Sequence, residues 1–360
     1  MIRLSSLIHI SDTIRIGNEL GTGGSGAVYK AWHIRLKKHV VVKEVKYCAV
    51  ERMEARRNET EALKNVKSMF LPQVYDFMVE GDRAFTVMEY IDGESFDKLL
   101  MRGESFTALQ ISRWYEQLAS ALDTIHGQEI CHCDVKPANI MLTPKGDVCL
   151  IDFSAALVGG NESKFISRSL GYASPEQYEA YQRVLCSSGA KSSQQSAGDD
   201  KPEYVETQAH SALNLTEYTD EYGAFEACGA IADASSRIDW KRSDIYSLGA
   251  TMYHISTGTP PPAQSHGPIT HTELEGVDEH IAYIIEKSMK YDPAERFESV
   301  WEIVSELRGA QIAQRVQSGR KPRNVQNSNK ARKKRGRAKK TAAIVAVLII
   351  AALIASRVHS

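Results

Sequence analysis

Residues 131 to 142 read CHCDVKPANIML, and this stretch decides the fold because it sets three polar groups at short spacing among apolar residues. Asp134, Lys136 and Asn139 offer a carboxylate, an ammonium group and a carboxamide. A carboxylate can accept a hydroxyl proton, an ammonium can neutralise developing negative charge, and a carboxamide oxygen can hold a magnesium ion. The stretch therefore predicts a catalytic loop, in which Cys133 is the residue without an evident task.

A second carboxylate follows the loop. Thirteen residues beyond Asn139, the run LIDFS places Asp152 at the end of a hydrophobic segment. Taken alone, Asp152 is explained equally well as a turn residue. Taken with the catalytic loop, Asp152 and Asn139 form a pair of oxygen ligands for magnesium ions that neutralise phosphates. We therefore expect the metal at Asn139 and Asp152.

A glycine-rich run precedes both features. Gly21, Gly23 and Gly26 fit the pattern GxGxxG, which alone indicates either a dinucleotide site or a flexible hairpin. A dinucleotide site needs a helix directly after the glycines, whereas residues 27–32, AVYKAW, alternate like a strand. The glycines therefore predict a hairpin whose backbone can close over phosphate oxygens.

Lys43 follows three valines in the run VVVK, which places it inside a strand. An inward ammonium group there requires an anion, and ATP phosphates or a helical glutamate can supply one. Glu59 is the expected glutamate because it precedes Leu63 by one helical turn, and Glu61 is the alternative.

The pattern along the chain changes from strands to helices. Short β-type runs dominate residues 14–90, with one helical stretch near residues 51–66, and helical spacing begins at Ser95. We expect an α+β fold with a small sheet-rich lobe, 14–90, and a larger helical lobe, 91–308. In the longest predicted helix, one apolar face carries Leu109, Trp114, Leu118, Leu122 and Ile125.

The stretch from about residue 182 to 236 differs from the rest of the helical lobe. It is rich in Ser, Gly and Gln, and it holds nine acidic residues against three basic ones. Such a composition buries little apolar surface, so we expect an exposed, largely disordered insertion.

The last part of the chain is basic and then apolar. Residues 309–340 form a predicted basic linker, and Ala342–Ala355 is a run of fourteen apolar residues. A bilayer span needs about 20 residues, so length alone leaves an interfacial or partner-bound helix as an alternative. Because the run is apolar all round and basic residues flank it, we expect residues 341–357 to form a transmembrane tail anchor. The positive-inside rule then predicts a cytoplasmic body at the cell membrane.

Charge and cysteines bound the partners and the compartment. From Leu307 onward there are fourteen Lys/Arg and no acidic residue, so residues 1–306 carry 30 bases against 45 acids, a net of -15. The basic tail could neutralise nucleic-acid phosphates, but its position beside an apolar run favours anionic lipid headgroups, and we expect no nucleic-acid partner. Six scattered cysteines indicate free thiols in a reducing compartment, and Cys131 and Cys133 lie too close together for a tetrahedral zinc site.

With these motifs in order, residues 14–308 resemble the eukaryotic-type (Hanks-type) protein Ser/Thr kinase family. The resemblance implies a two-lobed kinase fold that binds ATP and Mg²⁺, phosphorylates Ser/Thr hydroxyls of proteins and autophosphorylates, and it leaves a homodimer open. It assigns catalysis to Asp134, Lys136 and Asn139. It also implies a set of nucleotide contacts beyond the glycines and Lys43, made by Leu20, Val28, Val41, Met88, Glu89, Ile91 and Met141.

The resemblance further implies a set of supporting contacts. The run SLGYASPE looks like the end of the activation segment, in which Glu176 pairs with Arg296. Asp244 matches a helix carboxylate that braces the catalytic loop. Ser169 occupies the slot that bonds the catalytic Asp and Lys, which favours Ser/Thr acceptors over Tyr.

The sequence departs from the family at four places. Cys133 replaces an Arg, Ser154 replaces a Gly, Val41 replaces an Ala, and roughly fifty residues are inserted between Glu176 and Asp244. The whole most resembles bacterial membrane-linked Ser/Thr kinases. A thiol beside Asp134 should have little thiolate character, so Cys133 should be neutral and let the activation segment order without a phosphate.

Two other functions fit parts of the sequence. A pseudokinase or signalling scaffold would be supported by the loss of Lys43, Asp134, Asn139 or Asp152, and all four are present. A small-molecule phosphotransferase usually lacks a Lys at the position of Lys136 and the SPE-type segment. The protein kinase therefore remains the leading hypothesis.

Overall fold

The structure is a computed structural model that describes residues 13–23, 26–46, 57, 60–80, 83–159, 169–187, 238–262, 269 and 271–317. The chain divides into two units, residues 1–307 and 308–360. The sheets and helices described below belong to the first unit, except that the last helix runs past its end.

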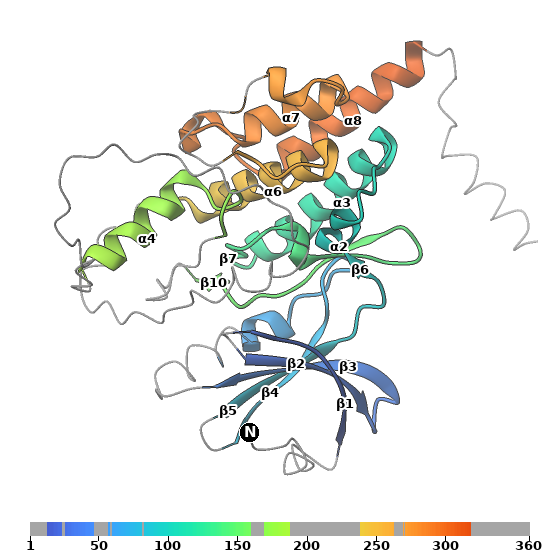
Figure 1. Ribbon diagram of the computed structural model, residues 1–360, viewed down its shortest axis with the longest axis vertical. Helices are drawn as coiled ribbons and strands as arrows, with labels where there is room; N and C mark the ends of the chain where they lie inside the picture. Colours follow the sequence, from blue (N-terminus) through green and yellow to red (C-terminus); the bar gives the residue numbers. More distant parts are fainter. Residues whose placement is uncertain are drawn as a thin grey trace, which may run out of the picture. The chain divides into compact units, whose positions relative to one another are not determined.

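Five antiparallel strands form the sheet of the small lobe, in the order β1-β2-β3-β5-β4 (Figure 1). Their positions confirm the strands predicted around the glycines and Lys43, and the Gly-rich run joins β1 to β2 as a hairpin. The bounds are β1 Ile14–Gly23, β2 Gly26–His33, β3 Lys38–Lys46, β4 Val74–Glu80 and β5 Arg83–Glu89.

The two faces of this sheet differ in burial, because successive side chains of a strand point to opposite faces. One face is the core of the lobe, formed by Ile14, Ala31, Val40, Val42, Phe85 and Val87. On the other face Val28 lies opposite Lys43, and Val41 lies opposite Met88. All four of these side chains are partly exposed. Cross-strand register thus gathers four of the predicted nucleotide contacts on the open face.

The helical lobe is built around a long central helix, α3, which contacts α6, while α6 packs against α7. A capping box between Thr107 and Gln110 starts α3, and the side chain of Asp239 caps α6. Trp114, Leu118 and Ile285 are fully buried in the core of this lobe. The bounds are α2 Phe96–Met101, α3 Ala108–His126, α4 Pro175–Ser187, α6 Trp240–Thr257, α7 Glu279–Ser288 and α8 Val300–Gln317.

Short strands hold the catalytic stretch at the base of α3. Strand β7 Ile130–Cys131 pairs with β10 Leu157–Val158, and β8 Ile140–Leu142 pairs with β6 Glu94–Ser95 and β9 Val148–Leu150. A single 3-10 turn, Pro137–Asn139, precedes β8. The predicted loop therefore runs between two strands that are each fixed by a partner.

The structure differs from the sequence predictions at three places. Helix α4 continues to Ser187, six residues into the stretch expected to be disordered, and α8 continues to Gln317, nine residues into the predicted linker. Leu109 is 76% exposed, so it is not part of the buried face of α3, because the first turn of that helix extends beyond the core. The remainder of the insertion and Ala342–Ala355 lie outside the described residues, and within the described ranges no helix is long and apolar enough to cross a membrane.

A buried ion pair ties the start of α4 to the end of the lobe. Arg296, whose side chain has no exposed surface, donates to both carboxylate oxygens of Glu176, at 2.7 and 2.8 Å. Its remaining donors reach the carbonyl oxygens of Lys290, Tyr291 and Arg242. Because every nitrogen of this guanidinium is bonded, its burial is compensated, and the predicted pair is confirmed.

Replacing Glu176 with Ala should destabilise the protein by roughly 3 to 5 kcal/mol, because it leaves a buried guanidinium without its counter-charge. Urea unfolding of the full chain measures this. The control is Glu94→Ala, which breaks the exposed pair with Arg102 and should change stability little. Equal unfolding curves for the Glu176 variant and the unaltered protein would refute the role of the pair.

Candidate active site

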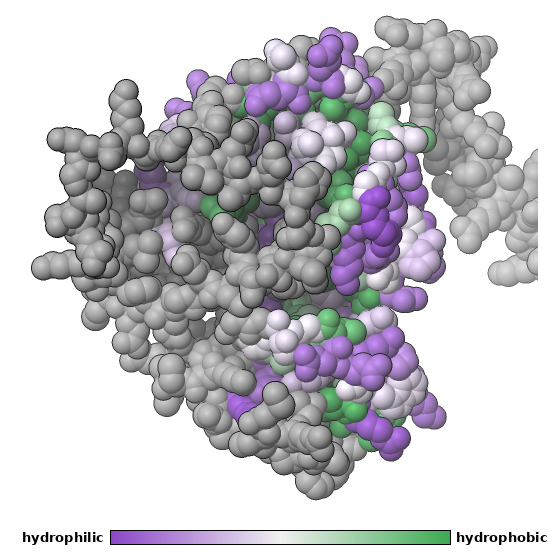
Figure 2. Space-filling view, in the orientation of Figure 1, coloured by the Kyte–Doolittle hydropathy of each residue, from purple (hydrophilic) through white to green (hydrophobic). Residues whose placement is uncertain are grey.

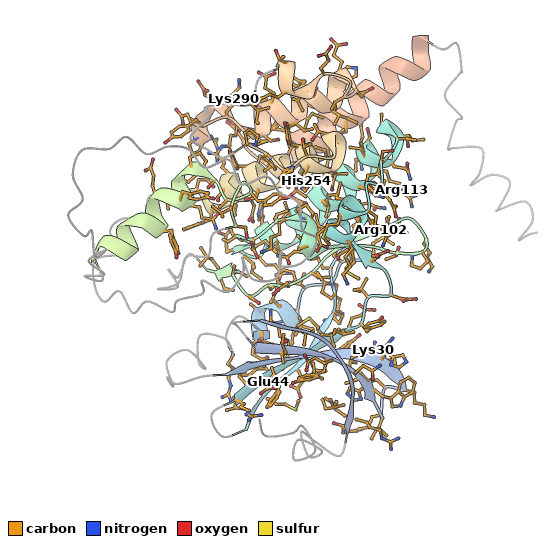
Figure 3. The ribbon with its side chains drawn as sticks, in the orientation of Figure 1. Lys30, Glu44, Arg102, Arg113, His254 and Lys290 are labelled. Atoms are coloured by element: carbon orange, nitrogen blue, oxygen red, sulfur yellow. The ribbon has the colours of Figure 1, made fainter. Side chains whose placement is uncertain are left out.

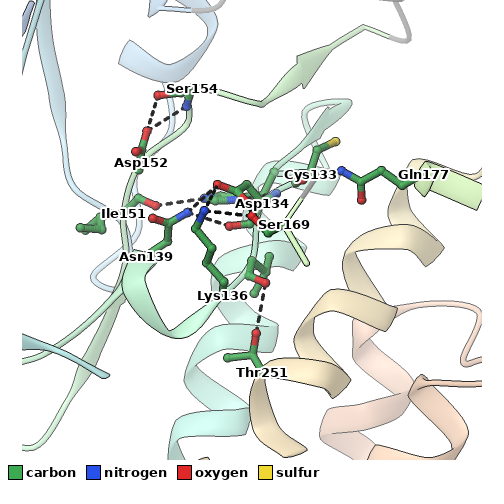
Figure 4. A network of polar contacts seen from close by, with 12 residues as sticks. Cys133, Asp134, Lys136, Asn139, Ile151, Asp152, Ser154, Ser169, Gln177 and Thr251 are labelled. Carbon is green, nitrogen blue, oxygen red and sulfur yellow. Dashed lines mark hydrogen bonds and ion pairs between the residues drawn. The ribbon is translucent and has the colours of Figure 1, made fainter. Parts of the chain in front are cut away.

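Three polar side chains contact the carboxylate of Asp134 (Figure 4). Oδ1 of Asp134 accepts from the hydroxyl of Ser169 at 2.6 Å, and Oδ2 accepts from Asn139 Nδ2 at 3.0 Å. The ammonium of Lys136 lies 3.0 Å from Oδ2 and donates to Ser169 at 2.9 Å. The predicted contacts of Ser169 with the catalytic Asp and Lys are thus confirmed.

The amide of Asn139 is oriented by the loop itself. Its nitrogen donates to the backbone oxygen of Asp134 at 2.8 Å as well as to the carboxylate. The amide oxygen is therefore the atom left for another partner, and oxygen is the ligand that Mg²⁺ prefers. The backbone oxygen of Asn139 accepts a hydrogen bond from the backbone nitrogen of Ile151, the residue directly before Asp152. This bond joins the two segments that carry the expected metal ligands. Asn139 and Asp152 together fit a magnesium ion.

Asp152 meets Lys43 from the other lobe. The ammonium of Lys43 lies 2.7 Å from Asp152 Oδ1 and also donates to the hydroxyl of Ser154. Ser154 donates to the same Oδ1 through its hydroxyl and through its backbone nitrogen, the latter at 3.0 Å. None of these bonds uses Oδ2 of Asp152, which leaves that oxygen available to a metal.

The charge state of Asp152 follows from these contacts. Burial acts to raise the pKa of Asp152, but the Lys43 ammonium and the hydrogen bonds from Lys43 and Ser154 outweigh burial and hold the pKa below its usual range. The carboxylate is therefore ionised at neutral pH, as a metal ligand must be. Glu59, the predicted partner of Lys43, lies outside the described residues.

The loop backbone is held by a carboxylate from helix α6. Asp244 has no exposed surface, and it accepts from the backbone nitrogens of His132 and Cys133, each at 2.8 Å. Its Oδ2 also lies 2.8 Å from Nε2 of His126. This confirms the predicted brace. Thr251 lies on α6, as Asp244 does, and its hydroxyl donates to the carbonyl of Val135 at 3.1 Å.

His132 links the catalytic loop to the segment that carries Asp152. Its Nε2 lies 3.1 Å from the carbonyl of Ile151, and its Nδ1 accepts from the nitrogen of Asp134 at 3.3 Å. Both bonds are satisfied when the ring proton is on Nε2. The ring also packs against Phe153, with 5.0 Å between centroids. The two metal-ligand segments are thereby held in one arrangement.

Cys133 occupies a strained backbone position with an uncharged side chain. Its φ is +60°, a left-handed conformation that is costly for a residue with a Cβ. Asp244 and Gln177 fix this conformation, since Gln177 Nε2 donates to the carbonyl of Cys133 at 2.9 Å. The thiol packs with Cys131 and Leu157 and points away from Asp134 (Figure 4).

The thiol of Cys133 is neutral, as predicted. Burial, reinforced by the negative charge of Asp244, raises the pKa of Cys133 well above its usual value. A buried thiol of this kind is a small apolar side chain and not a nucleophile. The pocket that would hold a guanidinium in the related kinases is therefore apolar in this chain.

The residues predicted to contact adenine lie on the sheet of the small lobe, just after β5, and on β8. Leu20 is 51% exposed on β1, next to Gly21, which lies opposite Val28. Gly26 has a φ of +137°, a conformation open to glycine, where the hairpin of Gly23 and Gly26 closes. The backbone nitrogen of Glu89 donates to Gln73, and Ile91 follows the end of β5 with its side chain partly exposed. Met141 lies on β8 and is also partly exposed.

Sequence reasoning missed three contributors to the site. Ser154 was recognised as a departure, but its hydroxyl proves to bridge Lys43 and Asp152. Gln177 and Thr251 reach the loop from α4 and α6 across more than forty residues of sequence. No local pattern marks such residues, because a side chain bonded to a distant carbonyl has no characteristic spacing.

One further cluster has metal-ligand chemistry. Ligand atoms of His126, Cys131 and Asp244 lie within 4.8 Å of one another in the buried loop support. The hydrogen bond between His126 and Asp244 already uses two of these atoms, and burial raises the pKa of the Cys131 thiol. The cluster is thus part of the brace that supports the catalytic loop.

Residues 14–186 match the protein kinase domain family. A probable serine/threonine-protein kinase of Clostridium acetobutylicum is 32% identical over 176 residues, which cover 47% of this chain and 27% of that protein. The human serine/threonine-protein kinase Nek5 is 33% identical over 165 residues, 44% of this chain and 23% of that protein. A probable serine/threonine-protein kinase of Bacillus subtilis is 29% identical over 157 residues, 42% of this chain and 61% of that protein.

The fold and the site therefore define a two-lobed protein kinase domain. Residues 14–186 belong to the protein kinase domain family, of the eukaryotic or Hanks type, and the predicted resemblance is confirmed. The chain spans about a quarter of the length of the first two relatives. The membrane-linked branch remains a prediction.

Asp244→Asn should destabilise the protein by about 1 to 3 kcal/mol, because an amide turns a donor toward at least one of the three groups that the carboxylate accepts from. Urea unfolding gives the value. Asp239→Asn, on the same helix, is the matched control, since Asn caps a helix as well as Asp does. A loss no larger than that of the control would show that Asp244 does not hold the loop.

Proposed function

We propose that this chain is an ATP- and Mg²⁺-dependent protein serine/threonine kinase that transfers the γ-phosphoryl group of ATP to hydroxyls of proteins. The observation that carries the proposal is the convergence of Asp134, Lys136 and Ser169 in one hydrogen-bonded group beside the Lys43 and Asp152 ion pair. Serine/threonine-protein kinases among the relatives support the same class.

Asp134 is the group that receives the proton of the acceptor hydroxyl. Its carboxylate accepts from Ser169, Asn139 and Lys136, which occupy three of its roughly four lone-pair sites. The remaining site is free to orient an acceptor hydroxyl. Because three fixed donors hold the carboxylate, the acceptor is presented in one geometry, which lowers the entropic part of the barrier.

The cations of the site surround the phosphoryl group. Lys136, held between Asp134 and Ser169, can neutralise charge on the transferred group, and Lys43 can contact the phosphates from the open face of the sheet. Asn139 and Asp152 would hold Mg²⁺, which would neutralise negative charge on the ATP phosphates. Lys43 and Ser154 keep Asp152 ionised and oriented for that role.

The bond from Ser169 to Asp134 and the bond from Lys136 to Ser169 favour Ser/Thr as acceptors. A scaffold function is less well supported, since Lys43, Asp134, Asn139 and Asp152, whose loss would favour it, are all present and hydrogen-bonded within the site.

Lys43→Met and Asp152→Asn should each reduce phosphoryl transfer at least a hundredfold, about 2.7 kcal/mol of barrier. The first removes a phosphate contact and the second a metal ligand. Initial rates of the full chain with labelled ATP, Mg²⁺ and a generic protein acceptor give the values, and Lys67→Met, an exposed lysine, is the control. Near-normal turnover in either variant would contradict the mechanism.

The neutral side chain of Cys133 leads to a prediction about how phosphorylation affects the kinase. A neutral thiol demands no counter-charge, so the activation segment should order without a phosphate, and phosphorylation should raise the rate by much less than a hundredfold. Initial rates of phosphatase-treated and autophosphorylated protein on a peptide acceptor measure the ratio. A gain of a hundredfold or more would mean that another basic residue performs the work of the missing Arg.

We also propose that the chain is tail-anchored at the cell membrane through residues 341–357, with the kinase domain on the cytoplasmic side. The proposal rests on the fourteen apolar residues Ala342–Ala355 and the basic residues before them. Fractionation after a high-salt wash, which releases electrostatically adsorbed protein, should place the full chain with membranes and a chain lacking residues 342–360 in the supernatant. Retention of the truncated chain in the membrane fraction would count against the anchor.

A further inference from the structure

Positive charge is concentrated in one short part of the small lobe. Residues 13–43 contain six Lys/Arg and one acidic residue, Glu19, a net of +5, although residues 1–306 together carry a net of -15. The remainder of those 306 residues therefore has a net charge of -20. A basic segment on such an acidic body creates a local field of opposite sign.

The basic residues meet apolar ones at the hairpin between β2 and β3. Trp32 is 37% exposed, Ile34 is 40% exposed and Leu36 is 48% exposed. In the sequence, Arg35 lies between Ile34 and Leu36 and Lys37 follows Leu36, and both cations are also exposed. Among the described residues, neither Arg35 nor Lys37 forms an ion pair. Together with Arg15, which lies opposite Trp32 on β1, these residues form what we call the hairpin surface.

The hairpin surface has a defined shape. The backbone nitrogen of Ile34 donates to the carbonyl of Thr13 at 2.8 Å, and that of Leu36 donates to Nδ1 of His33 at 3.3 Å. Lys37 closes the turn with a φ of +52°. These bonds hold Ile34 and Leu36 outward into solvent. The ring of Trp32 contacts that of His39 edge to face, with 5.0 Å between centroids, and still remains 37% exposed.

The acidic groups of the sheet do not neutralise the hairpin surface. Glu19 and Glu44 lie toward the other end of the strands, opposite Tyr29 and Ala27 (Figure 3). Glu44 is buried and pairs with Arg83. Glu89 is nearer, opposite Val40, but its carboxylate accepts from the backbone nitrogen of Gln73. Figure 2 shows hydrophobic and hydrophilic residues side by side on the visible face of this lobe.

From this pattern we infer that the hairpin surface binds the anionic surface of a lipid bilayer. Cations alternate with exposed apolar side chains along the turn, and a bilayer presents anionic headgroups directly above apolar chains. Trp32 suits the headgroup level, where its ring is apolar and its N–H can be solvated. Each cation near an anionic leaflet strengthens adsorption about fivefold. The inference concerns a binding surface and does not depend on the proposed catalytic activity.

The test follows Trp32 alone in the full chain. Vesicles of phosphatidylcholine, with or without phosphatidylglycerol, carry brominated acyl chains that quench tryptophans at the membrane. Subtracting the signal of Trp32→Phe isolates the quenching of Trp32. The ratio of this quenching in anionic to neutral vesicles should be about fivefold or more at low salt and fall toward one at high salt. The basic C-terminal residues also favour anionic vesicles, so the contribution of the hairpin surface is read from variants of that surface in the same full chain.

Two variants locate the effect. Arg35→Ser with Lys37→Asn removes both exposed cations, and Asn tolerates the left-handed turn position, so the ratio should fall toward one. Lys67→Ser with Met69→Ser removes one exposed cation and one exposed apolar side chain elsewhere on the lobe and should leave the ratio unchanged. Equal melting temperatures and equal activity on a peptide acceptor would show that the fold is intact.

Three results would overturn the inference. One is a ratio of one in the unaltered chain, and another is a high ratio that survives removal of Arg35 and Lys37. The third is evidence that a protein, and not a bilayer, binds the hairpin surface. A synthetic peptide of the acidic residues 199–226 would then protect the fluorescence of Trp32 from quenching by acrylamide, whereas anionic vesicles would not.

Discussion

The carboxylate of Asp244 is the group on which the rest of the site depends, because it is fully buried and must be compensated by hydrogen-bond donors. Two of these donors are backbone nitrogens of the catalytic loop, at His132 and Cys133. Their bonds force the loop into a left-handed turn at Cys133, and this turn presents the next residue, Asp134, to Ser169 and Asn139. A charge in the core of the helical lobe thus fixes the position of the catalytic carboxylate.

The second constraint is the apolar surrounding of Cys133. A buried Arg at this position would need a counter-charge, such as a phosphate, to compensate its burial. In this chain the thiol packs with Cys131 and Leu157, and β7 pairs with β10, so apolar contact and backbone bonds join the loop to the start of the activation segment. These contacts do not depend on a phosphate, so we expect control of the kinase to act elsewhere, through a partner or a surface.

Much of this architecture could be predicted from the sequence, where local pattern and chemistry agree. Valines before Lys43 indicated a strand, Thr107 and Gln110 lie where a helix begins, and the spacing of Asp134 and Asn139 indicated one loop. The failures have a common cause. The exposure of Leu109, the bridge made by Ser154 and the bond from Gln177 to Cys133 depend on neighbours that are distant in sequence, and periodicity carries no information about them.

The central claim is that this chain moves a phosphoryl group from ATP to a protein hydroxyl. The direct measurement is to incubate the full chain with γ-labelled ATP and Mg²⁺, alone and with generic protein acceptors, and to identify the labelled residues by mass spectrometry. The account predicts phosphoserine and phosphothreonine on the acceptor or on the chain itself, with no label when Mg²⁺ is chelated. ATP binding without any transfer to protein, or label confined to tyrosine or to small molecules, would contradict it.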